Sequence, residues 1–188
     1  MTNVKRVIQV SFLANYKTAD NISFNFRILC DLYQIYYHSS TIKKIRLRKP
    51  IIILIVSICE AILYDFIFRI RKFTNEGVTL PKKTLQQIQS NNQIKFGRLI
   101  GIAQSNNVFQ LPITNSKSIY KDLTVLKEIR DRVHIQWPGN LGIDESAIYT
   151  AANMKLAEDT LDLLISTIEK NHPRPGKAKF IPKFNIPW

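Results

Sequence analysis

Residues 51–70 read IIILIVSICEAILYDFIFRI and form the most apolar segment of the chain. Pro50 precedes this segment, and proline is well suited to the first turn of a helix. The uninterrupted apolar or near-neutral run ends at Cys59 and is followed by Glu60. This run is too short to cross a bilayer, which needs roughly 20 residues. We therefore predict a central helix over residues 51–72 that its neighbours bury on most sides.

Glu60 is the informative residue of this predicted helix. A carboxylate in such an apolar segment needs a charged or hydrogen-bonding partner, or it must be protonated. Helical spacing places Ser57, Glu60 and Tyr64 on one face. We expect this face to meet the helix that carries Arg130 and His134. The alternative is that Glu60 reaches the rim of the protein and contacts solvent or an exposed lysine.

Apolar residues at helical spacing predict further helices on both sides of this segment. The expected helices cover about residues 21–39 (with Asp20 or Asn21 as N-cap), 81–89, 93–104, 116–137, and 144–170 (with Asp144 as N-cap). Val4, Ile8 and Val10 fit either a short strand or the start of a helix. The sequence therefore predicts an all-α fold, a bundle of about five helices, formed by residues 1–170 as one domain.

The chain has two basic segments, one between two predicted helices and one after the last predicted helix. Residues 39–50 contain the cations Lys43, Lys44, Arg46, Arg48 and Lys49, with Pro50 at the end. We interpret this run as a solvated connector, with a patch that contacts phosphates as the alternative. Residues 171–188, NHPRPGKAKFIPKFNIPW, contain several prolines and cations and no acid. This composition predicts a basic tail that is extended or disordered.

The charge balance of the whole chain favours a polyanionic partner. Lys and Arg number 27 against 14 Asp and Glu, which gives a formal net charge of +13. Nucleic acid and an acidic membrane surface both fit this charge. Peripheral membrane attachment would require residues 51–68 to be exposed. The two cysteines, Cys30 and Cys59, lie in apolar helical patterns, and we see no signal peptide, so we expect a reducing cytoplasm and no stable membrane insertion.

The residues with the clearest chemical potential lie in the stretch LTVLKEIRDRVHIQW, residues 123–137. At about 100° per residue, Lys127, Arg130 and His134 fall on one narrow stripe of a helix. The neighbouring arc is apolar and consists of Leu126, Ile129 and Val133. The polar stripe can therefore line a cleft or a subunit interface. The alternative is structural: Lys127 pairs with Asp131, Arg130 extends along the surface, and His134 is a satisfied histidine at the border of the core.

Several familiar kinds of site are absent from the sequence. The chain has no GxxxxGK[ST] phosphate loop, no GxGxxG, no CxxC and no HExxH, and its three histidines are scattered. We therefore expect neither a metal site nor a cofactor. Metal-free RNA cleavage needs a base for the 2′-hydroxyl, an acid for the leaving oxygen and a cation for the phosphorane-like transition state. Imidazole and guanidinium supply these functions, and two copies of one His and one Arg across a dimer interface would supply all of them.

The stretches LKEIRDRVHI and SICEAILYDFIFRI resemble the HEPN superfamily of all-α proteins. The resemblance rests on Arg130-Asp131 followed by His134, and extends more loosely over residues 21–170. It implies a homodimeric, metal-independent endoribonuclease, commonly a toxin or an anti-phage defence component with an antitoxin or another partner protein. His134 and Arg130 would then be catalytic, Asp131 would position them, and Lys127 and Glu60 would support the site.

Two features depart from the family pattern. The family usually has a longer spacing between the arginine and the histidine, so the cation that faces the phosphate could be Lys127 instead of Arg130. Ile135, Gln136 and Trp137 follow the histidine in place of the tyrosine motif that some toxins carry. Some members of the superfamily are inactive and serve as RNA-binding modules or scaffolds. A non-catalytic RNA-binding or scaffold dimer is therefore the alternative function.

Overall fold

The computed structural model describes residues 5–72, 82–89, 95–109, 113–133, 144–174 and 182–188. The elements within these residues are β1 (Arg6–Gln9), α1 (Tyr16–Tyr37), α2 (Thr41–Lys72), α3 (Lys82–Gln89), α4 (Phe96–Ser105), α5 (Ile113–Asp131), α6 (Glu145–Ile148), α7 (Ala151–Asn171) and β2 (Lys183–Ile186). The described chain is mostly helical, which confirms the all-α class in its coarse form.

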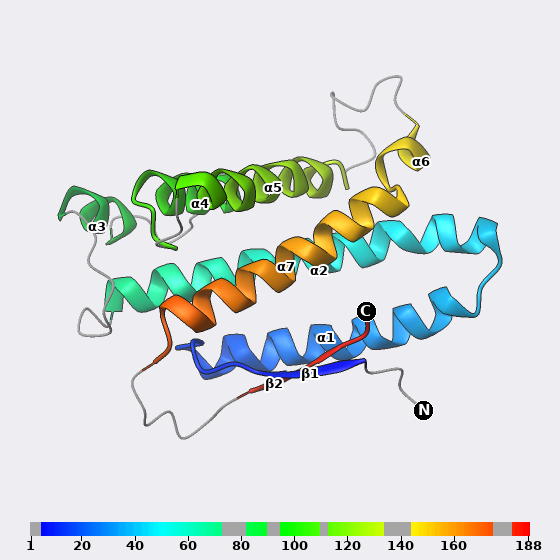
Figure 1. Cartoon of the computed structure of the whole chain (residues 1–188), viewed down its shortest axis with the longest axis horizontal. Helices are drawn as coiled ribbons and strands as arrows, with labels where there is room; N and C mark the ends of the chain where they lie inside the picture. The colour runs from blue at the N-terminus through cyan, green and yellow to red at the C-terminus, as the bar shows by residue number, and fades with distance from the viewer. Residues whose placement is uncertain (1–4, 73–81, 90–94, 110–112, 134–143, 175–181) are drawn as a thin grey trace.

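Helix α2 is the centre of the molecule, as its sequence predicted. It packs against α1, α4, α5 and α7, with α1 on one side of it and α4 and α5 on the opposite side (Figure 1). Most apolar side chains of residues 51–70 in this helix are buried, among them Ile51, Ile55, Ile62 and Phe66, none of which is exposed at all. Residues 51–68 are largely covered, whereas peripheral membrane attachment would require them to be exposed.

The helical segment 41–70 is long and apolar enough to cross a membrane when only length and composition are considered. Its most apolar window is 61% buried by the rest of the protein. The central helix of a packed bundle passes the same test. This segment therefore behaves as the core helix that the sequence predicted.

The start of α2 corrects one prediction. Residues 41–49 are not a connector, and Pro50 does not begin the helix but lies inside it. Proline in a helix interior removes one backbone hydrogen bond and is normally unfavourable. Here Pro50 is exposed and Ile51 and Ile52 directly after it are fully buried, so packing of the following turns outweighs the local preference.

Charged side chains near the C-terminal end of α2 bind the backbone of the segment before α1 and of the residue that follows α7. The carboxylate of Asp65 accepts hydrogen bonds from the backbone N–H groups of Ala14 and Asn15, at 2.8 and 3.0 Å. Asn15 in turn caps α1, five residues earlier than the predicted start of this helix. Buried Arg69 donates to the carbonyl oxygens of Phe12 and His172, at 2.9 and 2.8 Å. These bonds explain how a largely apolar helix accommodates ions.

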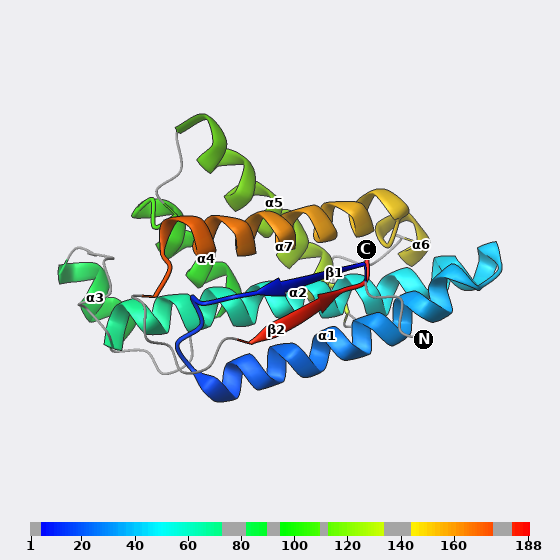
Figure 2. The same ribbon diagram turned by 60° about the horizontal axis from the view of Figure 1, so that its bottom comes forward.

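The two ends of the described chain form a small sheet: the short strand that was one of two interpretations near Ile8 is present, whereas its partner strand was not predicted. β1 pairs antiparallel with β2, with Ile8 opposite Phe184 (Figure 2). Phe184 and Ile186 are fully buried, and the ring of Phe184 stacks on Phe26 of α1 with centroids 4.9 Å apart. Residues 182–188 are therefore part of the core and not a free basic tail, while residues 175–181 lie outside the described chain.

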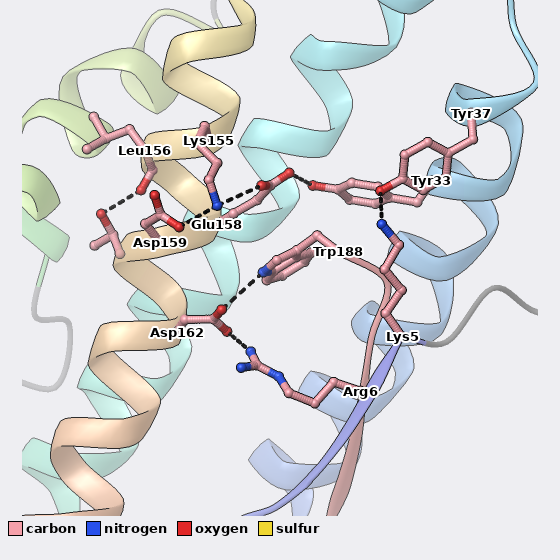
Figure 3. Close-up of polar contacts among 11 residues, drawn as sticks. Lys5, Arg6, Tyr33, Tyr37, Lys155, Leu156, Glu158, Asp159, Asp162 and Trp188 are labelled. Carbon is pink, nitrogen blue, oxygen red and sulfur yellow. Dashed lines mark hydrogen bonds and ion pairs between the residues drawn. The ribbon is translucent and has the colours of Figure 1, made fainter.

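Trp188 is held by a hydrogen bond to α7 and by a ring contact with α1 (Figure 3). The indole N–H of Trp188 donates to Asp162 at 3.3 Å, and Arg6 of β1 forms an ion pair with the same carboxylate. The Trp188 ring lies 5.6 Å from that of Tyr33, whose hydroxyl donates to Glu158 at 2.5 Å. The C-terminal end thus connects β1 and β2 to α1 and α7.

Two other helix boundaries differ from the predictions. Asp144 does cap a helix, but this helix, α6, is short, and Thr150 caps a separate helix, α7. Helix α5 begins at Ile113, ahead of the predicted start at residue 116, and ends at Asp131 instead of near residue 137.

Candidate functional site at the α2–α5 contact

The predicted contact between Glu60 and Arg130 is present. A guanidinium nitrogen of Arg130, Nη2, lies 3.3 Å from Oε2 of Glu60. Helix α5 runs antiparallel to α2, so the C-terminal end of α5 reaches the middle of α2 (Figure 1). Buried Leu126 and Ile129 face the core on the adjacent arc and fix the rotation of α5. The apolar period of the sequence therefore places Arg130 beside Glu60.

A second carboxylate on α5 binds both cations of the predicted stripe. Oδ2 of Asp131 accepts a hydrogen bond from Nζ of Lys127 at 2.6 Å, which is the i,i+4 ion pair that the structural alternative predicted. Oδ1 of Asp131 lies 3.4 Å from Nε of Arg130. This nitrogen is shielded from solvent and makes no hydrogen bond within the described residues. We refer to Glu60, Lys127, Arg130 and Asp131 as the Arg130 cluster.

Helix α4 forms the third side of the cluster, which the sequence did not indicate. The guanidinium of Arg130 lies over the ring of Phe96, 5.7 Å from its centroid, in cation–π geometry. Gly97 allows the stem of Lys127 to lie directly on α4, because a Cβ at this position would come within 2.9 Å of Cε of Lys127. Phe96 and Gly97 have no distinctive spacing relative to Arg130, so only the tertiary structure reveals their role.

The four side chains of the cluster are partly accessible, with exposed fractions between 26 and 32%. Their formal charges cancel, two cations against two carboxylates. Arg130 is held by contacts of 3.3 and 3.4 Å that are longer than a short bidentate pair. A phosphate that reached the cluster could therefore replace one carboxylate on the guanidinium. A shallow depression of about 120 Å³, lined by Lys127, Glu128, Asp131 and Arg132, adjoins the cluster.

The remaining predicted residues are placed as follows. His134 lies outside the described residues, so its position relative to Arg130 stays a prediction. Val133, expected on the apolar face, is 37% exposed because α5 has already ended before it. Ser57, predicted to share the face of Glu60, uses its hydroxyl to donate to the carbonyl of Ile53 at 2.8 Å. The structure thus brings together four of the five predicted site residues.

Comparison of the chain with models of protein families, with curated proteins and with solved structures found no match.

Proposed function

We propose that this chain is a metal-independent endoribonuclease of the HEPN type, with His134 as general acid or base and Arg130 as the phosphate clamp. The observation that carries the proposal is the Arg130 cluster. Carboxylates from α2 and α5 hold Arg130 in a partly accessible place, four residues before His134 in the sequence. The net charge of +13 favours an RNA substrate over a neutral one.

The proposed reaction proceeds without a metal. A base removes the proton of a ribose 2′-hydroxyl, the 2′-oxygen attacks the adjacent phosphorus, and the bond from phosphorus to the 5′-oxygen breaks. An acid gives a proton to this leaving oxygen, so the products carry a 2′,3′-cyclic phosphate and a 5′-hydroxyl. Arg130 would bind the equatorial phosphate oxygens, where negative charge accumulates in the transition state. Phosphate would compete with Glu60 for the guanidinium, while Asp131 keeps Lys127 and Arg130 oriented.

One imidazole cannot be base and acid in the same step. We therefore propose a two-fold homodimer in which His134 of each chain contributes to a shared site. A role as a toxin or an anti-phage defence component, controlled by an antitoxin or another partner protein, is the biological setting that fits this activity.

The alternative is a non-catalytic RNA-binding or scaffold dimer. One observation favours it: Arg130 and Lys127 are already paired with carboxylates, so the cluster is neutral as a whole. A neutral cluster serves well as a link between α2, α4 and α5 without any chemistry. The two readings differ in whether RNA is cut.

The test is cleavage of total RNA by purified protein in buffer with EDTA. We expect cleavage by the parent chain and a rate lower by about 10²–10⁴ for His134→Ala, because an acid–base group contributes this much. His38→Ala is the matched control, since His38 is exposed at the end of α1 and we expect no change. Equal cleavage by His134→Ala would exclude the assignment, and binding without any cleavage would favour the scaffold.

A further inference from the structure

A groove lies between the N-terminal part of α2 and α6. It has a volume of about 290 Å³ and is lined by Ile45, Arg46, Lys49, Glu145, Ser146 and Tyr149. We call it the α2–α6 groove. Figures 1 and 2 both place α6 beside this part of α2. One wall of the groove belongs to the basic run of residues 39–50, for which the sequence allowed either a connector or a phosphate-binding patch.

The helical form of this run decides how its cations are arranged. Ile42, Arg46 and Lys49 are spaced by four and three residues, so they share one face of α2. This face looks toward α6, because Arg46 and Lys49 line the groove. A disordered connector would spread its charges in all directions. The helix places two cations of the run, Arg46 and Lys49, along one wall of the groove.

The two cations of the groove differ in their partners. Nζ of Lys49 binds Oε1 of Glu145 at 2.6 Å and lies over the ring of Tyr149, 5.3 Å from its centroid. Arg46 is exposed, and no carboxylate of the described chain lies within ion-pair distance of it. Residues 39–50 contain no acid that could neutralise the run. The groove therefore keeps a net positive wall, which Glu145 offsets only in part.

The groove also connects to the Arg130 cluster. The hydroxyl of buried Tyr149, which lines the groove, donates to the carbonyl of Ile129 at 3.3 Å, next to Arg130 in the chain. Arg132, just beyond α5, is close enough to Tyr149 to oppose the rise in the tyrosine pKa that burial causes. Tyr149 therefore joins the wall of the groove to the C-terminal end of α5.

We propose that the α2–α6 groove binds the phosphodiester backbone of single-stranded RNA, with Arg46 and Lys49 as phosphate contacts, and guides the strand to the Arg130 cluster. RNA is chosen as the polyanion because this proposal rests on the proposed ribonuclease function. The concave shape of the groove and its link to α5 favour a strand over a flat anionic membrane. Charge complementarity of this kind acts on any RNA sequence and weakens with salt.

The experiment measures binding of a short 2′-O-methyl RNA, which cannot be cleaved because it lacks the attacking hydroxyl. For Arg46→Glu we expect Kd to rise on the order of tenfold. The slope of log K against the logarithm of the salt concentration should become less steep by about 0.7 for each lost phosphate contact. Lys17→Glu is the matched control: it makes the same change of charge on the exposed face at the start of α1, and its Kd should stay within about twofold of the parent.

A gain-of-affinity variant separates loss of binding from loss of folding. Glu145→Gln removes the carboxylate that pairs with Lys49, so we expect RNA binding to tighten severalfold. Equal effects of Arg46→Glu and Lys17→Glu, an unchanged Kd for Glu145→Gln, or no RNA binding by the parent chain would each overturn the proposal. Sedimentation with anionic vesicles that depends on Arg46 while RNA binding does not would overturn it in favour of a membrane.

The RNA-binding experiment and the RNA-cleavage experiment can fail separately. If His134→Ala cuts RNA normally but Arg46→Glu loses binding of the uncleavable RNA, the catalytic assignment fails and the groove stands. If His134→Ala is inactive and Arg46→Glu binds like the parent, the groove fails and the catalytic assignment stands.

Discussion

His172 illustrates how a single buried side chain joins distant parts of this fold. Its ring nitrogen Nε2 lies 2.7 Å from the carbonyl oxygen of Val108, so the neutral ring carries its proton on Nε2 and donates it there. Arg69 binds the backbone carbonyl of His172. Burial lowers the pKa of His172, and the charge of Arg69 lowers it further, although the bond to Val108 acts in the opposite direction.

We predict that His172 makes the stability of the protein depend on pH. The unfolded chain takes up the proton near the ordinary histidine pKa of about 6.5, while the folded chain takes it up only at lower pH. The stabilising contribution is therefore complete above pH 6.5 or so and is lost as the pH falls through the lowered pKa of the folded state. His172→Gln keeps an N–H donor without this titration, so its Tm should fall less between about pH 7.5 and pH 5.

The control for this measurement is His38→Gln, because His38 is exposed and bonds only to a carbonyl of its own helix among the described residues. This variant should follow the parent chain at every pH. A parent and a His172→Gln variant whose Tm curves run parallel would contradict the prediction.

At the scale of elements, the β1–β2 sheet closes the bundle over α1. Phe184 supplies a fully buried ring to this contact. Phe184→Ala should lower the free energy of unfolding by about 3–5 kcal/mol, since it removes a buried ring and leaves a cavity. Phe24→Ala on the outer face of α1, where the ring is 57% exposed, should cost less than about 0.5 kcal/mol. Urea unfolding of both variants checks the difference, and equal losses would show that β2 does not contribute to the core.

The central helix and the Glu60–Arg130 contact could be predicted from the sequence because both follow from helical periodicity. Residues 51–70 predict a buried helix because Glu60 interrupts the apolar run before it is long enough to span a bilayer, and the apolar arc of Leu126 and Ile129 orients Arg130 toward α2. Phe96 and Gly97 could not be predicted, since they reach the cluster only through the packing of α4. Such contacts depend on tertiary structure and leave no local pattern.

The errors at the ends of elements have identifiable physical causes. Pro50 favours a helix start locally, yet α2 continues through it because the following turns are deeply buried. The alternation of Lys183, Phe184, Asn185 and Ile186 is a strand signal, with exposed and buried positions in turn, but the surrounding prolines and cations obscured it. Short strands at chain ends gain their stability from distant partners, so composition alone misleads there.

Across the molecule, two neighbouring sites differ in their net charge. The Arg130 cluster is neutral in itself, whereas the α2–α6 groove retains positive charge beside it. This division would let the groove supply affinity and the cluster supply orientation. RNA binding and RNA cleavage should therefore respond to different substitutions, Arg46→Glu for the first and His134→Ala for the second.

The proposed two-fold dimer makes a prediction that concerns two molecules together. If each site needs His134 from both chains, a mixed dimer of parent and His134→Ala chains has no complete site. After exchange in an equal mixture, about half of the parent chains are in mixed dimers, so activity should fall to about half that of the same amount of parent alone. A tenfold excess of His134→Ala should reduce it to about one tenth. His38→Ala chains in the same excess should not inhibit, and cleavage that stays constant as His134→Ala is added would mean that each chain works alone.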